Sequence, residues 1–305
     1  MSHWQDLLNG IHADALRLRG VGKVADYIPA LAEVPAEKFG IALCTVDGEH
    51  AAVGDADLSF SIQSISKVYT LVLALRVVGD ALWTRCGREP SGNKFNSLVQ
   101  LEHEHGIPRN PFINAGALVV TDQLVVHSVN ARLLLLGLLR QLTGNPRLNC
   151  DARVARSEAG HGHRNAALVN FMKSFGVIQG DVATVLDTYF HQCAVAMSCR
   201  ELARASLFLA NRGIDPGSAE PILNPLQTRR VNALLLTCGL YDAVGDFAYD
   251  VGLPAKSGVG GGIVAIVPGK LAICAWAPEL DESGNSVVAQ EALKLFVERT
   301  GLGVF

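Results

Sequence analysis

The chain has 305 residues, of which 49% are hydrophobic and 18% are charged, and its formal net charge is −3. This composition is typical of a packed globular protein with a large core and excludes an intrinsically disordered chain. Because the charge is nearly balanced and forms no basic cluster, the chain has no electrostatic reason to bind nucleic acid or an anionic membrane. We therefore expect a small-molecule partner.

The first part of the chain predicts a helix followed by the beginning of a sheet. Residues 3–19 are typical of a helix, and glycines and a proline then interrupt the pattern. Residues 39–46 predict a strand, Asp47-Gly48 a hairpin turn, and residues 50–53 the partner strand.

The middle of the chain predicts mostly helices. Apolar residues follow Ser64 at helical spacing, which indicates a buried helix. The run Leu133–Leu139 is too short to span a bilayer, so we expect a core helix or an interface helix there. Further helices are predicted at residues 115–126, 130–143, 151–158, 165–175, 181–193, 198–211 and 228–238.

Strands return near the end of the chain, at residues 262–267 and 271–276, and a helix from 286 to about 300 follows. Strands at both ends with helices between them predict a single α/β (α+β) domain, residues 1–305, built on one antiparallel sheet. We expect a sheet subdomain from about 1–65 and 240–305, and an inserted helical subdomain from about 66–239. The cleft between them is a plausible small-molecule site.

The cysteines and the N-terminus both indicate a cytoplasmic protein. Seven cysteines are scattered along the chain without C-x-x-C spacing, which fits reduced thiols. The first residues have neither the basic start nor the apolar core of a signal peptide.

Two lysine motifs suggest acyl-transfer chemistry. In Ser64-Ile65-Ser66-Lys67, the spacing places hydroxyl and amine on one face of a helix, where a desolvated amine can take the hydroxyl proton. Lys256-Ser257-Gly258 opens a Gly-rich strand near the other end of the chain, and a second cation nearby would keep the first amine neutral. A helix-capping serine followed by a solvent-reaching lysine explains the first motif equally well.

A second S-x-x-K pattern occurs at Ser91-Gly92-Asn93-Lys94. Its glycine and asparagine, preceded by Pro90, predict a turn without a rigid helix beneath it. We discount Ser91 as a nucleophile.

A longer series of segments decides between these interpretations. The chain resembles the serine-dependent glutaminases, enzymes of the β-lactamase-like fold, from about Gly22 to about Ser286. The resemblance rests on these segments in this order: residues 22–29, Gln63-Ser64-Ile65-Ser66-Lys67, Glu89-Pro90-Ser91-Gly92, Asn114-Ala115-Gly116-Ala117, Ser157-Glu158, Arg164-Asn165, Tyr189-Phe190, Cys238-Gly239-Leu240-Tyr241-Asp242 and residues 256–262.

The resemblance implies hydrolysis of L-glutamine to L-glutamate and ammonia through an acyl-enzyme on Ser64, without a cofactor. Lys67 would be the general base, and Tyr241 would share the proton transfer or hand a proton to the departing ammonia. The backbone amides of Ser64 and Val259 would form the oxyanion hole. Enzymes of this family are generally oligomeric, so we expect a dimer or a tetramer.

The other matched residues suit an amino-acid substrate. Glu158 can pair with the ammonium group, while Asn114, Asn165, Tyr27 and Tyr189 can bind the carboxylate and the amide. Without the resemblance, each of these residues alone would be taken as a helix cap, a packed aromatic or a solvated helix residue. Ala194 departs from the family pattern, which has serine there, and this puts affinity rather than chemistry in doubt.

Three other site types have weaker support. The glycines of residues 258–262 precede a strand and not a helix, which excludes a dinucleotide loop. His103-Glu104-His105 and His161-Gly162-His163 lack the i, i+4 spacing of a zinc motif, so we expect no metal. A β-lactam-directed serine hydrolase or a non-catalytic sensor on the same fold remains as an alternative function.

Overall fold

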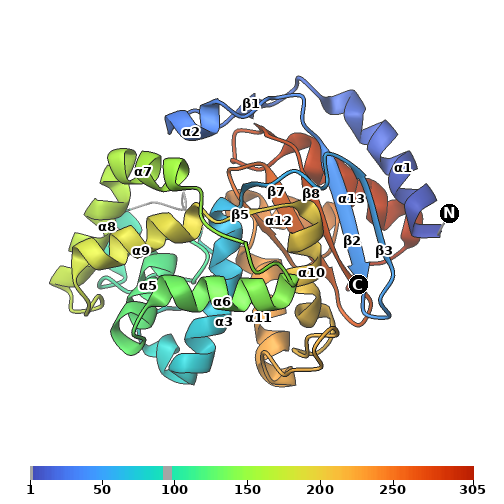
Figure 1. The fold of residues 1–305 in the computed structure, drawn as a ribbon. Helices are drawn as coiled ribbons and strands as arrows, with labels where there is room; N and C mark the ends of the chain where they lie inside the picture. Colours follow the sequence, from blue (N-terminus) through green and yellow to red (C-terminus); the bar gives the residue numbers. More distant parts are fainter. Residues whose placement is uncertain (1–2, 92–97) are drawn as a thin grey trace.

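A computed structural model describes residues 3–91 and 98–305 and shows a five-stranded antiparallel sheet in the order β3-β2-β8-β7-β6 (Figure 1). The predicted sheet built from both ends of the chain is confirmed. Its strands are β2 (Gly40–Thr45), β3 (His50–Gly54), β6 (Ala255–Ser257), β7 (Gly262–Val267) and β8 (Leu271–Trp276). Two short antiparallel pairs join β1 (Lys23–Val24) to β9 (Glu279–Leu280) and β4 (Phe60–Ser61) to β5 (Ala196–Met197).

Both faces of the sheet are covered by helices. In β8, Ile273 and Ala275 pack into one apolar cluster with α1 (His3–Ala15) and α13 (Val287–Thr300). The alternate residues Ala272 and Cys274 pack into a second cluster, which includes α10 (Cys199–Ala210). Because successive side chains of a strand point to opposite faces, a sheet covered on both sides needs apolar residues at nearly every position.

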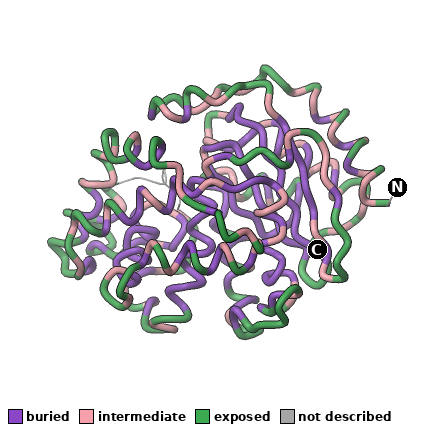
Figure 2. Tube along the Cα trace, in the orientation of Figure 1, coloured by how far each residue is buried: buried purple, intermediate pink, exposed green. Residues whose placement is uncertain are grey.

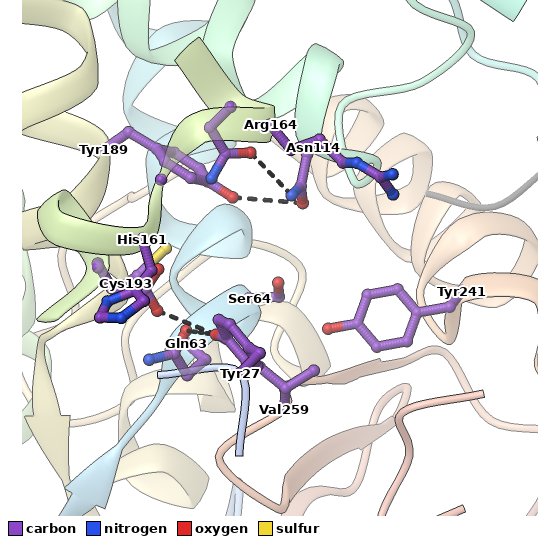
Figure 3. Close-up of a pocket in the computed structure, with 13 residues that line it drawn as sticks. Tyr27, Gln63, Ser64, Asn114, His161, Arg164, Tyr189, Cys193, Tyr241 and Val259 are labelled. Atoms are coloured by element: carbon purple, nitrogen blue, oxygen red, sulfur yellow. Dashed lines mark hydrogen bonds between the residues drawn. The ribbon is translucent and has the colours of Figure 1, made fainter. Parts of the chain in front are cut away.

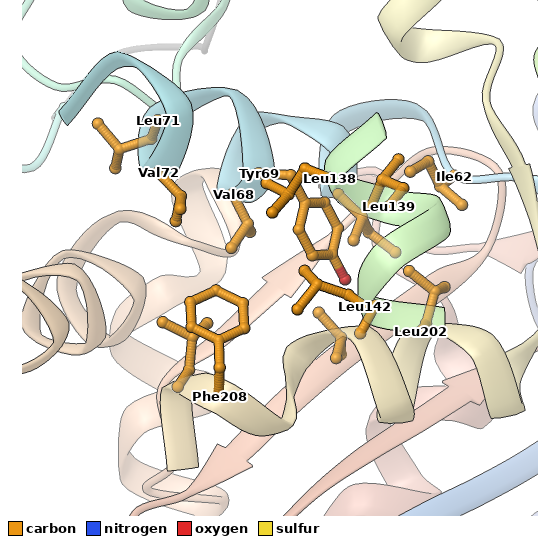
Figure 4. Packing of buried hydrophobic residues seen from close by; sticks show 14 of the residues in the cluster. Ile62, Val68, Tyr69, Leu71, Val72, Leu138, Leu139, Leu142, Leu202 and Phe208 are labelled. Carbon is orange, nitrogen blue, oxygen red and sulfur yellow. The ribbon is translucent and has the colours of Figure 1, made fainter. Parts of the chain in front are cut away.

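Most of the remaining helices lie beside the sheet, where α5, α6 and α9 pack against α3, whose residues Ser66 to Leu75 are all buried (Figures 1 and 2). Figure 4 shows how Val68, Tyr69 and Val72 of α3 pack against α6 and α10. This packing fixes the helix that follows Ser64. The helices are α2 (Pro29–Ala32), α3 (Ser66–Val77), α4 (Leu98–His103), α5 (Asn114–His127), α6 (Ala131–Thr143), α7 (Ala152–His161), α8 (His163–Ser174), α9 (Val182–Cys193), α11 (Pro225–Cys238) and α12 (Val244–Asp250).

The sequence predictions differ from the structure in a few places. The strand expected to open at Lys256 is wrong: Lys256 and Ser257 end the edge strand β6, and a tight turn separates it from β7. Gly261 adopts φ +94° in that turn, a conformation that favours glycine. The first helix ends as a 3-10 turn at Leu16–Leu18, and α4 and α12 are too short to produce a clear periodic pattern. Lys94 lies outside the described residues.

The division into two subdomains remains a prediction. α10 belongs to the predicted helical part by sequence, yet it lies against β2, β7 and β8. No single helix of residues 3–91 and 98–305 is long and apolar enough to cross a bilayer.

Two helical glycines provide a matched stability test. A Cβ at Gly116 in α5 would lie 1.8 Å from the carbonyl oxygen of Asn110, whereas a Cβ at Gly137 in α6 would meet nothing within 4 Å. We expect Gly116→Ala to lower the free energy of unfolding by about 1–3 kcal/mol through overpacking. Gly137→Ala should raise it by about 0.5–1 kcal/mol, because alanine is the better helix former. Urea unfolding of both variants tests this, and equal stabilities would contradict it.

Candidate active site

A cavity of about 350 Å³ opens between the helices and the sheet (Figure 3). It brings together all eight residues that the sequence assigned to substrate binding, although they come from segments far apart in the chain. Those residues are Tyr27, Ser64, Asn114, Glu158, Asn165, Tyr189, Tyr241 and Val259. Of the other predicted residues, Lys67 is buried and bonds to Asn114 in the cavity wall.

Ser64 lies in a sharp turn immediately before α3. Gln63 has φ 49°, in the left-handed region that non-glycine residues rarely adopt, and a 3-10 turn at Gln63–Ile65 leads into the helix. Gly258 and Gly260 pack against this turn, because a Cβ at these positions would lie 2.6 Å from Ile62 O and 2.2 Å from Ser61 O. The glycines therefore let the segment that carries Val259 approach the serine turn.

Lys67 is the second residue of α3, and its amine is buried. Its Nζ donates to the backbone oxygen of Phe112 at 3.1 Å and to Asn114 Oδ1 at 2.8 Å. Burial lowers the pKa of Lys67 to about 8, although the carboxylate of Glu158 raises it somewhat. Roughly a tenth of this amine is therefore neutral at pH 7, far more than for an exposed lysine, and only this neutral form can accept a proton.

Tyr241 has its hydroxyl directed toward Ser64 in Figure 3. Burial raises its pKa to about 12, while hydrogen bonds with the Ser64 side chain and the Val259 backbone lower it in part. Tyr241 also has φ 51°, so two of the residues that line the cavity, Gln63 and Tyr241, have a strained backbone. The phenol is protonated at neutral pH and can donate a proton.

Lys256 lies outside the cavity wall. Its amine is fully buried and donates to Gly239 O at 2.7 Å and to Ser257 O at 2.8 Å. Burial lowers the pKa of Lys256 well below its usual value, and the charge of Lys67 lowers it further. The sequence predicted that Lys256 would keep Lys67 neutral, whereas burial is the largest effect on Lys67 in the structure.

Asn114 links the buried amine to the substrate side of the cavity. Its Oδ1 accepts from Lys67 at 2.8 Å and from the Tyr189 hydroxyl at 3.3 Å, and its Nδ2 donates to Asn165 Oδ1 at 3.0 Å. Asn114 is the first residue of α5, and its side chain bonds to these three side chains. The side chain therefore orients Lys67 and two cavity residues.

Glu158 is buried in the cavity wall. Burial raises its pKa, while hydrogen bonds from Tyr27, at 3.0 Å, and from Gln63 lower it in part. Ionising a buried carboxylate costs free energy, and a cationic ligand beside it would stabilise the ionised form.

Sequence reasoning missed five residues that also line the cavity. Gln63 and Arg164 adjoin assigned residues in the quoted segments, so their position was the available signal, whereas Cys193 lies outside those segments. His161 and Gly162 belong to the histidine pair considered for a metal. In the described ranges, no group of three His, Cys, Asp or Glu side chains is placed to hold a metal ion. The five residues are Gln63, His161, Gly162, Arg164 and Cys193.

Ala194, which departs from the family pattern, is fully buried in an apolar cluster with Ile28 and Leu31. It does not line the cavity. The missing hydroxyl therefore changes packing behind the site and not the cavity wall.

Comparison with known proteins gives a consistent result. The family model described as Glutaminase matches residues 22–305. The glutaminase of Aeromonas salmonicida (strain A449) is 56% identical over 301 residues, covering 98% of this chain and 98% of the relative. The glutaminase of Paraburkholderia phytofirmans (strain DSM 17436 / LMG 22146 / PsJN) is 54% identical over 303 residues, covering 99% and 100%.

Solved structures agree with the sequence relatives. The probable glutaminase ybaS has a TM-score of 0.94 at 37% identity, covering 99% of this chain and 97% of that chain. A probable glutaminase from Bacillus subtilis, complexed with 6-diazo-5-oxo-L-norleucine, has a TM-score of 0.90 at 32% identity, covering 100% and 98%.

Proposed function

The chain belongs to the glutaminase family, and from this premise we propose that its cavity hydrolyses L-glutamine through an acyl-enzyme on Ser64. Glutaminase activity and the β-lactamase-like fold follow from the family match and the structural neighbours. The family match also favours a glutaminase over a sensor or a β-lactam-directed hydrolase. The single observation that supports the Ser64 mechanism best is the strained turn that places Ser64 against Tyr241, above a helix with a buried lysine.

In the proposed mechanism, neutral Lys67 takes the proton of the Ser64 hydroxyl while Ser64 Oγ attacks the amide carbon of the substrate. Backbone amides of Ser64 and Val259 stabilise the oxyanion. Collapse of the tetrahedral intermediate breaks the C–N bond, while Tyr241 gives a proton to the departing nitrogen, which leaves as ammonia, and takes back the proton that Lys67 holds. Water then hydrolyses the ester, so that glutamate leaves and Ser64 regains its proton.

Substrate binding follows the charges of the cavity. Glu158 pairs with the substrate ammonium, and this role is supported by its burial and by its hydrogen bond from Tyr27. Asn114, Asn165 and Tyr189 already form a hydrogen-bonded group on the other wall and can bind the carboxylate and the amide.

We also propose a homo-oligomer in the cytoplasm. Leu133 of α6 is 60% exposed beside the fully exposed Val129, although most of the Leu133–Leu139 run is buried within the chain. The cytoplasmic location is supported by the seven cysteines, all of which are free.

Ser64→Ala should reduce the rate of ammonia release from L-glutamine at least about 1000-fold. Glutamine binding should remain detectable, because only the nucleophile is lost. L-asparagine and a chromogenic β-lactam serve as comparison substrates, and Ser174→Ala on the exposed face of α8 is the control. Mass spectrometry after treatment with 6-diazo-5-oxo-L-norleucine should show a covalent adduct on Ser64 in the wild type alone. Near-normal turnover in Ser64→Ala would exclude the acyl-enzyme mechanism.

The pH dependence should report Lys67. Because the base must be neutral, kcat/KM should rise with pH through about 8, the pKa that burial gives Lys67. A substrate ammonium at Glu158 adds positive charge near Lys67 and so lowers the pKa of Lys67 in the substrate complex. The rise of kcat with pH should therefore lie at lower pH than the rise of kcat/KM. Steady-state kinetics from pH 6 to 10, a range that spans about two units on either side, tests both. A flat kcat/KM profile would remove Lys67 from the base role.

Glu158→Gln should mainly weaken binding, raising KM by about 10- to 100-fold, because a charge-assisted hydrogen bond to the ammonium is replaced by a neutral one. The loss of affinity at acid pH in the wild type should begin above the usual range of a glutamate, since burial raises the pKa of Glu158, and it should be absent from Glu158→Gln. Glu298→Gln on the exposed face of α13 is the control. An unchanged KM would contradict the assignment.

A further inference from the structure

Lys256 is a buried lysine that the proposed mechanism does not use. Its Nζ lies 4.6 Å from the centroid of the Tyr241 ring and donates to the carbonyl oxygens of Gly239 and Ser257. An ammonium group has three N–H donors, and here two meet carbonyl oxygens while the ring face lies within cation–π distance. The amine thus contacts the Tyr241 ring and the backbone carbonyls of Gly239 and Ser257.

The two carbonyls belong to the segments that hold the Tyr241 turn. Gly239 follows the last residue of α11, and Ser257 is the last residue of β6. The segments also meet directly: Ser257 N donates to Gly239 O at 3.3 Å, and a Cβ at Gly239 would lie 1.7 Å from Ala255 O. Lys256 therefore joins the end of α11 to the edge of the sheet, immediately before Tyr241.

The turn at Tyr241 needs such support. A non-glycine residue with φ 51° costs conformational energy and persists only where its surroundings enforce it. The same turn directs the phenol hydroxyl toward Ser64 (Figure 3). An error of about 1 Å in the position of such a group can reduce a rate about 100-fold.

Lys256 does not line the cavity, and the hydrogen bonds of Lys67 go to Phe112 and Asn114. A direct role on substrate is therefore excluded by position. Two titratable neighbours, Lys67 and Cys238, influence the pKa of Lys256. The competing role is an electrostatic one, in which the charge of Lys256 tunes Lys67.

We propose that Lys256 is a positioning residue that acts through Tyr241: its amine contacts the ring face and binds the Gly239 carbonyl two residues earlier, which keeps the hydroxyl close to Ser64. The inference rests on the proposed role of Tyr241 in proton transfer. It gives the two lysine motifs different functions: Lys67 accepts a proton, and Lys256 holds the residue that shares it.

A double-mutant cycle tests the inference with wild type, Lys256→Met, Tyr241→Phe and the double variant. Methionine fills a similar volume without donors or charge. Lys256→Met should lower kcat about 10- to 100-fold in the wild type, but less than about twofold in the Tyr241→Phe background, where the positioned hydroxyl is gone. Lys270→Met, at an exposed position in the β7–β8 turn, should leave kcat unchanged.

Two outcomes would overturn the inference. An equal loss in both backgrounds would mean that Lys256 acts independently of Tyr241. An upward shift of the kcat/KM limb in Lys256→Met would mean that Lys256 tunes Lys67, because removing a nearby cation raises the pKa of a lysine. If Tyr241→Phe alone keeps the wild-type kcat, the proposed role of Tyr241 fails instead.

Circular dichroism and thermal unfolding establish whether each variant is folded. Lys256→Arg keeps the charge and the donors, so it should retain more kcat than Lys256→Met. If Lys256→Met does not fold, the same cycle is run with Lys256→Arg and Tyr241→Phe. Additive losses in that cycle would also overturn the inference.

Discussion

Burial of the Lys67 amine is the constraint on which the site depends. A buried lysine is costly to keep charged, and the structure meets part of that cost with the Phe112 carbonyl and Asn114 Oδ1. The positions of these acceptors depend on the close approach of α5 to the segment before it. Residue 116 must be glycine there, because a Cβ would clash with the carbonyl oxygen of Asn110. The packing of α3 on α5 therefore sets both the position of the amine and its proton affinity.

Gln63 and Tyr241, the two residues with a strained backbone, line the same cavity. Each is held by tertiary contacts: glycines 258 and 260 pack against the serine turn, and Lys256 lies beneath the tyrosine ring. Strain at both positions is tolerable only because the three-layer core fixes the segments that carry them. Stability of the fold and alignment of the reacting groups are therefore supplied by the same contacts.

The sequence predicted the sheet and nearly every long helix, because periods of 2 and 3.6 are strong signals. It also predicted eight of the 13 residues that line the cavity, since a series of segments in one order carried the family resemblance. It did not predict the path of the chain at Lys256, because a glycine-rich strand and a short strand followed by a tight turn have similar local sequences. The partner of Lys256 depends on the conformation of residue 241, which no local pattern encodes.

The charges of the cavity connect binding with chemistry. Glu158 raises the pKa of Lys67, and Lys67 lowers the pKa of Glu158, so the free site favours an ionised pair. An amino-acid ammonium placed at Glu158 neutralises that carboxylate and adds a like charge near Lys67. Both effects favour loss of the Lys67 proton. In the proposed mechanism, the group that selects an α-amino substrate therefore also prepares the base, and a ligand without the ammonium would occupy the cavity but leave Lys67 more often protonated.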